Sequence, residues 1–236
     1  MRRFLSILAG AVLLTPISVQ AADTWSGAYV GLSAGGGWSS ADWLNRASNP
    51  PATFFDYVPG QGFSDGLHGF IGGVQAGLNV QRGPWVFGVE AMLNGADIVG
   101  SFTSNAPLGA GDDQFKARMA ALFMATARVG YAWNDWLAYA KGGYAAADIR
   151  VSVSDNVAPT TGSGKDSQWQ SGAVAGIGIE YRIAPRVSLA AEYNHIWLGS
   201  GTYQLGGGAG NYSWDVDIGD INIVMVRLNY RFADGL

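Results

Sequence analysis

The sequence lacks several features that would assign it to a common class of protein. It contains no cysteine, so neither disulfides nor thiolate metal sites support its fold. Charged residues make up only 14%, and Lys and Arg (14) are fewer than Asp and Glu (18). This balance gives no support to nucleic-acid binding, which requires a basic surface. Only one apolar segment has the character of a helix, and it is N-terminal, so a bundle of transmembrane helices is excluded.

That apolar segment, residues 4–14, follows Arg2 and Arg3 and is followed by small residues. A short positive stretch, an apolar core and small residues are typical of a secretory signal peptide. The core is too short for a transmembrane helix, which needs about 20 apolar residues. We therefore predict a cleaved signal peptide at residues 1–21, with a retained membrane anchor as the alternative. The mature part, residues 22–236, has 12 basic and 18 acidic residues and is long enough for one domain.

Glycine (35 residues) and aromatic side chains are abundant, and they occur in runs where every second residue is apolar. Short turns follow the second, fourth and sixth runs, and long polar loops follow the odd runs. This layout predicts an all-β protein, an eight-stranded antiparallel up-and-down transmembrane β-barrel with short periplasmic turns and long extracellular loops. The runs exceed the five or six residues of ordinary soluble strands. They lie at residues 25–38, 67–82, 85–100, 115–133, 136–152, 167–183, 186–202 and 216–232.

The two faces of each run differ in kind. In the sixth run, Ile177 and Ile179 share one face, whereas Gly176, Gly178 and Glu180 share the other. The second face has too few large polar side chains for a water-exposed surface, but it suits a narrow and crowded lumen. We therefore predict that the apolar face contacts lipid and that the interior is packed and polar. A soluble β-sandwich, with the apolar face inside, is the alternative.

The less apolar face carries charges at similar distances from the short turns. At about 3.3 Å per residue and a tilt near 40°, they fall in one layer about 13–18 Å above the periplasmic rim. An eight-stranded barrel is narrow enough for such side chains to meet. We predict a structural salt-bridge layer that closes the lumen, with a proton relay or a catalytic carboxylate pair as the alternative. Its members are Glu90, Arg128, Lys141, Glu180, Glu192 and Arg227.

Aromatic residues gather near the short turns and the end of the last run, as they do at membrane interfaces. We expect Trp38, Trp169, Trp197 and Trp214 at the opposite, extracellular rim. The predicted periplasmic belt consists of Trp85, Tyr131, Trp133, Trp136, Tyr181, Tyr230 and Phe232.

The sequence offers few candidates for catalysis or ligand binding. The two histidines, His68 and His195, lie on runs that are not neighbours in the predicted barrel, and no Ser/His/Asp set shares a location. We therefore predict no enzyme activity, no cofactor and no metal. Haem ligation by His68 or Tyr57 is an alternative. The predicted loops are acidic, with Arg46 and Lys165 as their chief cations, and would reach lipopolysaccharide phosphates only through divalent cations.

Five segments carry a resemblance to a known family: "WSGAYVGLSAGGGW" (25–38), "GFIGGVQAGLNVQRGPWVFGVEAMLNG" (69–95), "ARVGYAWNDWLAYAKGGYA" (127–145), "AGIGIEYRIAPRVSLAAEYNHI" (175–196) and "VRLNYRF" (226–232). They resemble the porin-family outer-membrane immunogenic proteins of alphaproteobacteria, within the group of opacity-type surface antigens. The resemblance implies a monomeric barrel in the cell outer membrane, in contact with lipid and lipopolysaccharide. It also implies insertion by the barrel-assembly machinery, which reads a C-terminal aromatic residue, whereas here residues 233–236 follow Phe232.

The family is associated with envelope integrity, host contact and, in some members, haem binding. From these considerations we expect a non-enzymatic outer-membrane surface protein with a closed lumen and a possible host or envelope partner for its loops. A narrow pore or a ligand-uptake protein is the alternative, and a barrel hydrolase is a third possibility.

Overall fold

The computed structural model describes residues 25–49, 59–104, 113–155, 162–207 and 210–232. The predicted signal peptide and residues 233–236 lie outside these ranges. Among the described residues, no helix is long and apolar enough to cross a membrane. The described residues form ten strands: β1 (Gly27–Asn49), β2 (Gly62–Arg82), β3 (Trp85–Thr103), β4 (Gln114–Trp133), β5 (Trp136–Asp155), β6 (Gly162–Ala184), β7 (Val187–Leu198), β8 (Gly201–Gly207), β9 (Gly210–Ile218) and β10 (Ile221–Arg231).

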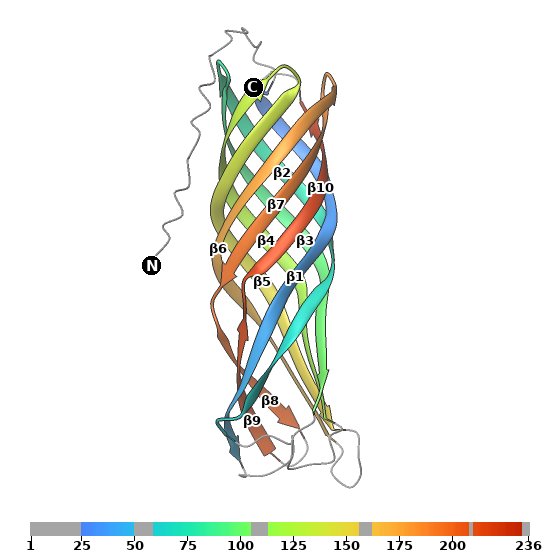
Figure 1. Ribbon diagram of the computed structural model, residues 1–236, viewed down its shortest axis with the longest axis vertical. Coiled ribbons are helices and arrows are strands. Elements are labelled where there is room, and N and C mark those ends of the chain that lie inside the picture. Colours follow the sequence, from blue (N-terminus) through green and yellow to red (C-terminus); the bar gives the residue numbers. More distant parts are fainter. Residues whose placement is uncertain (1–24, 50–58, 105–112, 156–161, 208–209, 233–236) are drawn as a thin grey trace, which may run out of the picture.

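Eight of these strands close a ring in the order β1 to β7, then β10, which pairs again with β1. Neighbouring strands are antiparallel throughout, so the predicted eight-stranded up-and-down barrel is confirmed (Figure 1). The predicted seventh run divides at Gly199 into β7 and β8. The eighth divides at Gly219 into β9 and β10. The β8–β9 hairpin continues the wall at the distal end, at the bottom of Figure 1, where β9 pairs with β1.

The barrel is much longer than a membrane is thick. From Trp38 on β1 we move to its partner Asn222 on β10 and then from partner to partner through β7 and down to β2. This path returns to β1 at Ala28, ten residues away, and such a stagger tilts eight strands by about 40°. The 20 residues of β4 then span about 50 Å along the axis, against an apolar band of about 25 Å. Much of the predicted first loop, residues 39–66, is therefore strand and lies in β1 and β2.

Three two-residue turns join the strands at the opposite, periplasmic end. The β2–β3 turn contains Gly83 (φ 58°) and the β4–β5 turn contains Asn134 (φ 51°). Both backbones are in the left-handed region that glycine and asparagine tolerate, which matches the twist of tight hairpins. These turns fix the register of the long strands above them.

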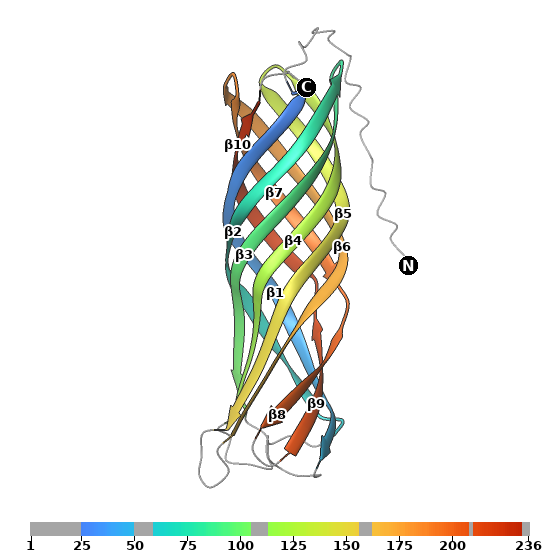
Figure 2. The same ribbon diagram turned by 180° about the vertical axis from the view of Figure 1, so that it is seen from behind.

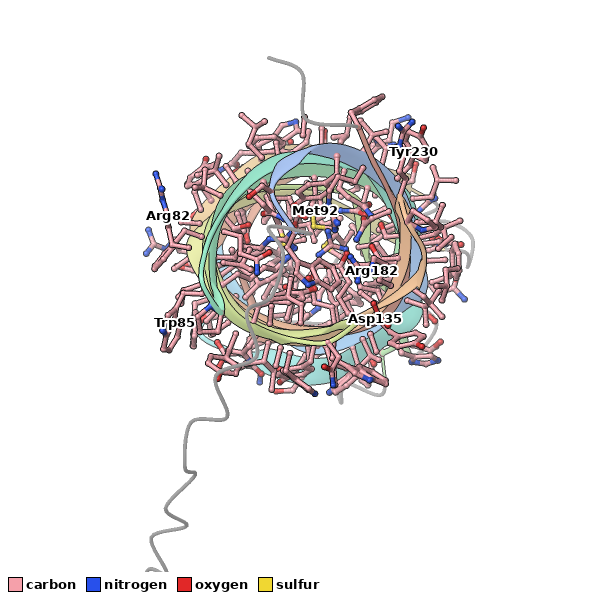
Figure 3. All side chains as sticks on the ribbon, turned by 90° about the horizontal axis from the view of Figure 1, so that it is seen from above. Arg82, Trp85, Met92, Asp135, Arg182 and Tyr230 are labelled. Atoms are coloured by element: carbon pink, nitrogen blue, oxygen red, sulfur yellow. The ribbon has the colours of Figure 1, made fainter. Side chains whose placement is uncertain are left out.

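Around this periplasmic half, apolar side chains face outward as the alternation predicts. Ile177 is 63% exposed, whereas Arg227 is fully buried. Viewed along the axis, Trp85 and Tyr230 project from the wall and Met92 lies within the tube (Figure 3). The apolar band is therefore the lipid-facing surface.

In the distal half the two faces exchange character. Inward side chains such as Ile98, Phe115 and Ile149 are buried in a large apolar cluster, whereas Lys116 and Arg150 face outward and are exposed. The prediction of a polar interior is therefore wrong for this half. The wall there stands in water, so the ordinary inside-apolar rule of soluble proteins applies.

One seam in the distal wall has no backbone ladder among the described residues. Side chains join β6 to β8 instead: Gln168 Nε2 donates to the Thr202 carbonyl (2.7 Å), and the Gln204 N–H donates to the Asp166 carboxylate (2.9 Å). Gln170 Nε2 also lies 2.9 Å from the hydroxyl of Tyr203, and burial raises the pKa of that hydroxyl above its usual value. Figure 2 shows the distal strands from behind.

Candidate functional site: the buried charge layer

Four charged side chains meet at the centre of the lumen. The Arg227 guanidinium on β10 donates to Glu90 on β3 through Nη2 and to Glu192 on β7 through Nη1. Lys141 Nζ on β5 lies 2.7 Å from Glu192 Oε1 and 3.5 Å from Glu90 Oε1. All four side chains are buried, so two carboxylates share two cations that come from opposite parts of the wall.

The remaining two predicted residues form a second pair beside this centre. Arg128 Nη1 lies 3.5 Å from Glu180 Oε2, and Arg128 Nε donates to Asn79 Oδ1 (3.0 Å). Glu180 also accepts hydrogen bonds from Ser188 and from Asn229 Nδ2 (3.0 Å). The structure thus brings all six predicted charges into one buried layer with three carboxylates and three cations.

Two tyrosines, which sequence reasoning missed, complete the layer. The Tyr29 hydroxyl donates to Glu90 (2.6 Å), and the Tyr139 hydroxyl donates to Glu192 (2.7 Å). The Arg128 guanidinium lies over both rings, 4.7 Å from the centroid of Tyr29 and 5.1 Å from that of Tyr139. In the alternating pattern of β1 and β5 both tyrosines fall on the lumen-facing side, and this is the feature of the sequence that could have identified them.

Each tyrosine ring occupies space left by a glycine on the next strand. Gly77 is paired with Tyr29, and Gly178 is paired with Tyr139. A Cβ at either glycine would collide with the tyrosine ring. Glycine at these two positions therefore lets the rings lie flat against the wall and reach the glutamates.

The layer contains an internal repeat. Across β1–β3 the paired residues run Tyr29, Gly77, Glu90, and across β5–β7 they run Tyr139, Gly178, Glu192. The next strand of each half supplies an arginine, Arg128 in β4 and Arg227 in β10. Glu90 is paired with residue 126, two before Arg128, and Glu192 is paired with residue 225, two before Arg227. The two halves of the ring thus repeat one Tyr-Gly-Glu-Arg arrangement.

Lys141 and Glu180 are the charges outside this repeat. By register, Lys141 corresponds to Gly31 in the first half, and Glu180 corresponds to Asn79. They add one charge of each sign, so the layer remains balanced. Balance matters here because an unpaired charge in a buried site is costly.

The arrangement favours structure over chemistry. Glu90 and Glu192 are bridged by Arg227 and Lys141, so neither carboxylate is free to accept a proton from a substrate. Among the described residues, no group of three or more His, Cys, Asp or Glu side chains could hold a metal ion. The layer therefore has the composition of a cross-link between strands.

Apolar side chains fill the lumen beyond the layer. Met92 marks the boundary, with its sulfur 3.5 Å from Lys141 Nζ. Farther out, Trp43, Phe115 and Trp214 pack edge to face, with the Phe115 and Trp214 centroids 5.1 Å apart. Trp214 is fully buried in this cluster, so its predicted place at the extracellular rim is wrong. On the periplasmic side, a smaller apolar cluster forms around Trp25.

The structure places the aromatic residues predicted for the periplasmic belt on the outer surface near the short turns. Trp136 contacts Tyr181 with the two rings tilted (centroids 4.5 Å apart), and Trp85 meets Tyr131 edge to face (5.5 Å). Trp38, Trp169 and Trp197 are also exposed on the outside, at the other end of the apolar band. The seven belt residues Trp85, Tyr131, Trp133, Trp136, Tyr181, Tyr230 and Phe232 are all exposed.

The histidines do not meet. His68 is exposed on β2, and His195 on β7 lies 2.9 Å from Asn222 Oδ1 and 3.2 Å from Asp220 Oδ2. In the ring, β1 and β10 separate these two strands. Tyr57, the other haem candidate, lies outside the described residues. The loop cations Arg46 and Lys165 belong to β1 and β6, so they are strand residues and not loop residues.

Comparisons with known proteins place these features in a family. Residues 7–232 match the family model described as outer membrane protein beta-barrel domain. The chain is 29% identical to the 31 kDa outer-membrane immunogenic protein of Brucella melitensis, over 96% of this chain and 93% of that protein. It is 25% identical to the 25 kDa outer-membrane immunogenic protein of Brucella abortus, over 81% and 74%. Among solved structures, the outer membrane protein OprG from Pseudomonas aeruginosa aligns at a TM-score of 0.46 with 11% identity, over 91% and 100%.

Proposed function

The chain belongs to the outer membrane protein beta-barrel domain family, and from this premise we propose that it is a closed, non-enzymatic surface protein of the cell outer membrane. In this proposal the barrel anchors a rigid distal extension whose exposed end contributes to envelope integrity and host contact. The observation that carries the proposal is the filled lumen.

Two kinds of packing support a closed lumen. The side chains of Glu90, Lys141, Glu192 and Arg227 have no solvent exposure. Beyond them the apolar cluster around Phe115 and Trp214 fills the described part of the lumen, and the polar side chains of the distal half, Asn45, Ser104 and Asp113, are themselves buried. An ion crossing the barrel would have to part the ion pairs and then enter the apolar section, and both steps are costly.

The reversed faces of the distal half support surface display. The wall continues as a bulged β-sheet for about 25 Å beyond the apolar band, with polar side chains outside and an apolar core within. A core of this kind holds the distal end rigidly above the lipid. The Brucella relatives are named as immunogenic, which agrees with exposure at the cell surface for those proteins.

Conductance in planar bilayers tests the closed lumen against the pore alternative. We expect no channel activity above background from the refolded full chain. A Glu192→Ala variant, which opens the layer, stays silent because the apolar section still blocks the path. A steady conductance in the wild type that rises in Glu192→Ala would replace this proposal with that of a narrow pore.

The contact role is tested on whole cells. A strain without the protein is complemented with the full chain or with a variant that lacks residues 50–58 between β1 and β2. Adhesion to host cells and resistance to detergent are then compared. Loss of adhesion with detergent resistance retained assigns host contact to that end. Equal adhesion by both strains removes the host-contact role.

A further inference from the structure

A group of cations lies on one side of the distal wall, directly beyond the apolar band. Arg118 on β4 and Arg150 on β5 are paired residues on adjacent strands, and both face outward. Lys116 and Lys165 are each paired with Ser152, one on either side of it. These four side chains, Lys116, Arg118, Arg150 and Lys165, form a basic patch across β4, β5 and β6.

The patch is only partly neutralised. Arg118 Nε lies 3.0 Å from Asp97 Oδ1, and Arg150 Nη2 lies 2.7 Å from Asp148 Oδ2. Within the part of the chain that the structure describes, no ion pair reaches Lys116 or Lys165. Like charges placed opposite one another in a sheet repel, and here two arginines are directly opposed. An anion bound between them would remove that repulsion.

The position of the patch matches the headgroup zone of the outer leaflet. On β5, Arg150 is six residues beyond the exposed Tyr144, and on β6 Lys165 is four residues beyond the exposed Trp169. At an axial rise of about 2.5 Å per residue these intervals are about 15 and 10 Å. Aromatic residues mark the membrane interface, so the cations lie among the headgroups.

The other side of the barrel has the opposite sign at the corresponding level. Asp42 on β1 is directly paired with Asp217 on β9, and Asp215 lies next to them. The nearby Arg46 is already paired with Asp215 (2.7 Å). The distal wall is therefore not basic all round, and an anionic ligand is directed to β4–β6.

We propose that the basic patch binds the phosphate groups of lipopolysaccharide in the outer leaflet. Arg150 donates to Asp148 Oδ2 through both Nε (3.0 Å) and Nη2 (2.7 Å), and Arg118 Nε faces Asp97. Because a guanidinium has five N–H donors, each of the two opposed arginines can donate to a phosphate oxygen as well as to its aspartate. The contact is direct, whereas the sequence alone suggested that acidic loops would reach these phosphates through divalent cations. The inference rests on the outer-membrane location and is independent of the closed lumen.

Native mass spectrometry of the full chain in detergent tests the proposal, with bisphosphorylated lipid A as the probe. The test variant is Arg118→Gln/Arg150→Gln. The matched control is Arg46→Gln, which removes an outward distal arginine outside the patch. We expect the double variant to bind the probe at least about tenfold more weakly and the control to change it by less than about twofold. Dephosphorylated lipid A should bind wild type and double variant equally.

Heat-modifiable gel mobility establishes that each variant is folded before binding is compared. Unchanged binding of bisphosphorylated lipid A to the folded double variant overturns the proposal. So does the outcome in which the patch contacts the acidic side of a second copy. In that case Asp42→Asn/Asp217→Asn would abolish chemical cross-linking between copies, the arginine variant would do the same, and lipid binding would not change.

Discussion

The periplasmic and distal halves of this barrel use the same strands with opposite sidedness. Near the short turns, Ile177 faces lipid and Glu180 faces the lumen; at the far end, Arg150 faces out and Ile149 faces in. The alternation along β3 and β5 continues through both halves, so in these strands residue type changes and sidedness does not. In β4, a bulge between Met119 and Ala121 shifts the alternation by one residue. The surrounding medium, lipid or water, therefore determines which face is apolar.

The two halves also depend on different forces. In lipid the outer face gains nothing from burial against protein, so strands are tied together through the lumen by ion pairs and hydrogen bonds to Glu90 and Glu192. In water the distal half buries large apolar side chains such as Phe115 and Trp214, which the hydrophobic effect stabilises directly. Substitutions can therefore separate the halves.

The largest effect is expected from the charge layer. Arg227→Met leaves Glu90 and Glu192 with one fewer cation in a buried site, and we expect it to lower the free energy of unfolding by about 3–5 kcal/mol. Urea unfolding in lipid vesicles measures the loss. In a Glu90→Gln background the same substitution should cost less, because less buried charge is left without a partner. An equal loss of unfolding free energy in both backgrounds would show that Arg227 and Glu90 do not interact energetically.

The next effect concerns the lipid-facing surface. Ile177→Arg places a charge near the middle of the apolar band and is expected to cost about 2–4 kcal/mol. The matched control is Thr103→Arg, an exposed outward position in the distal half, with a change within about 0.5 kcal/mol. Equal costs at both positions would show that the two outer surfaces face the same medium.

A smaller effect is expected in the distal core. Ile149→Val removes one buried methylene from the apolar cluster and should cost about 1 kcal/mol. Hydrogen exchange should report the loss chiefly in the distal parts of β4 and β5, with the amides around Lys141 unchanged. Uniform loss of protection along both strands would mean that the halves unfold as one unit.

The smallest effect is expected for an exposed ion pair of the distal wall. Arg46→Gln breaks the contact with Asp215, and both partners remain accessible to water. The expected cost is below about 1 kcal/mol and falls further with added salt. Comparison with Arg227→Met under the same unfolding conditions shows how much burial increases the free energy that is lost when an arginine–carboxylate pair is broken.

Much of the membrane half could be predicted from the sequence. The short turns set the height of each residue and the alternation sets its side, so both the lipid-facing isoleucines and the positions of Glu180 and Glu192 followed from counting. The partners within the lumen could not be counted in this way, because the stagger of the strands decides which side chains meet. Tyr29 and Tyr139 were missed for that reason.

The distal half was predicted less well. Segments with glycine, aspartate and proline were interpreted as loops, although Asp42 and Asp65 belong to long strands. The change of the inner face from charged to apolar was visible in β3, from Glu90 to Ile98, but its meaning depended on where the membrane ends. Lys165 was noted as a loop cation, but its grouping with Lys116, Arg118 and Arg150 was missed because their adjacency arises from strand pairing.

The β6–β8 seam is the most weakly bonded junction of the described distal wall. Gln168, Gln170 and Asp166 hold that edge, whereas backbone ladders join the other neighbouring strands of the described wall, so we expect this edge to open before the ring in the membrane does. Surface proteases, antibodies and deuterium should reach this edge first. Substitutions in β8 and β9 should be tolerated there without destabilising the barrel in the membrane.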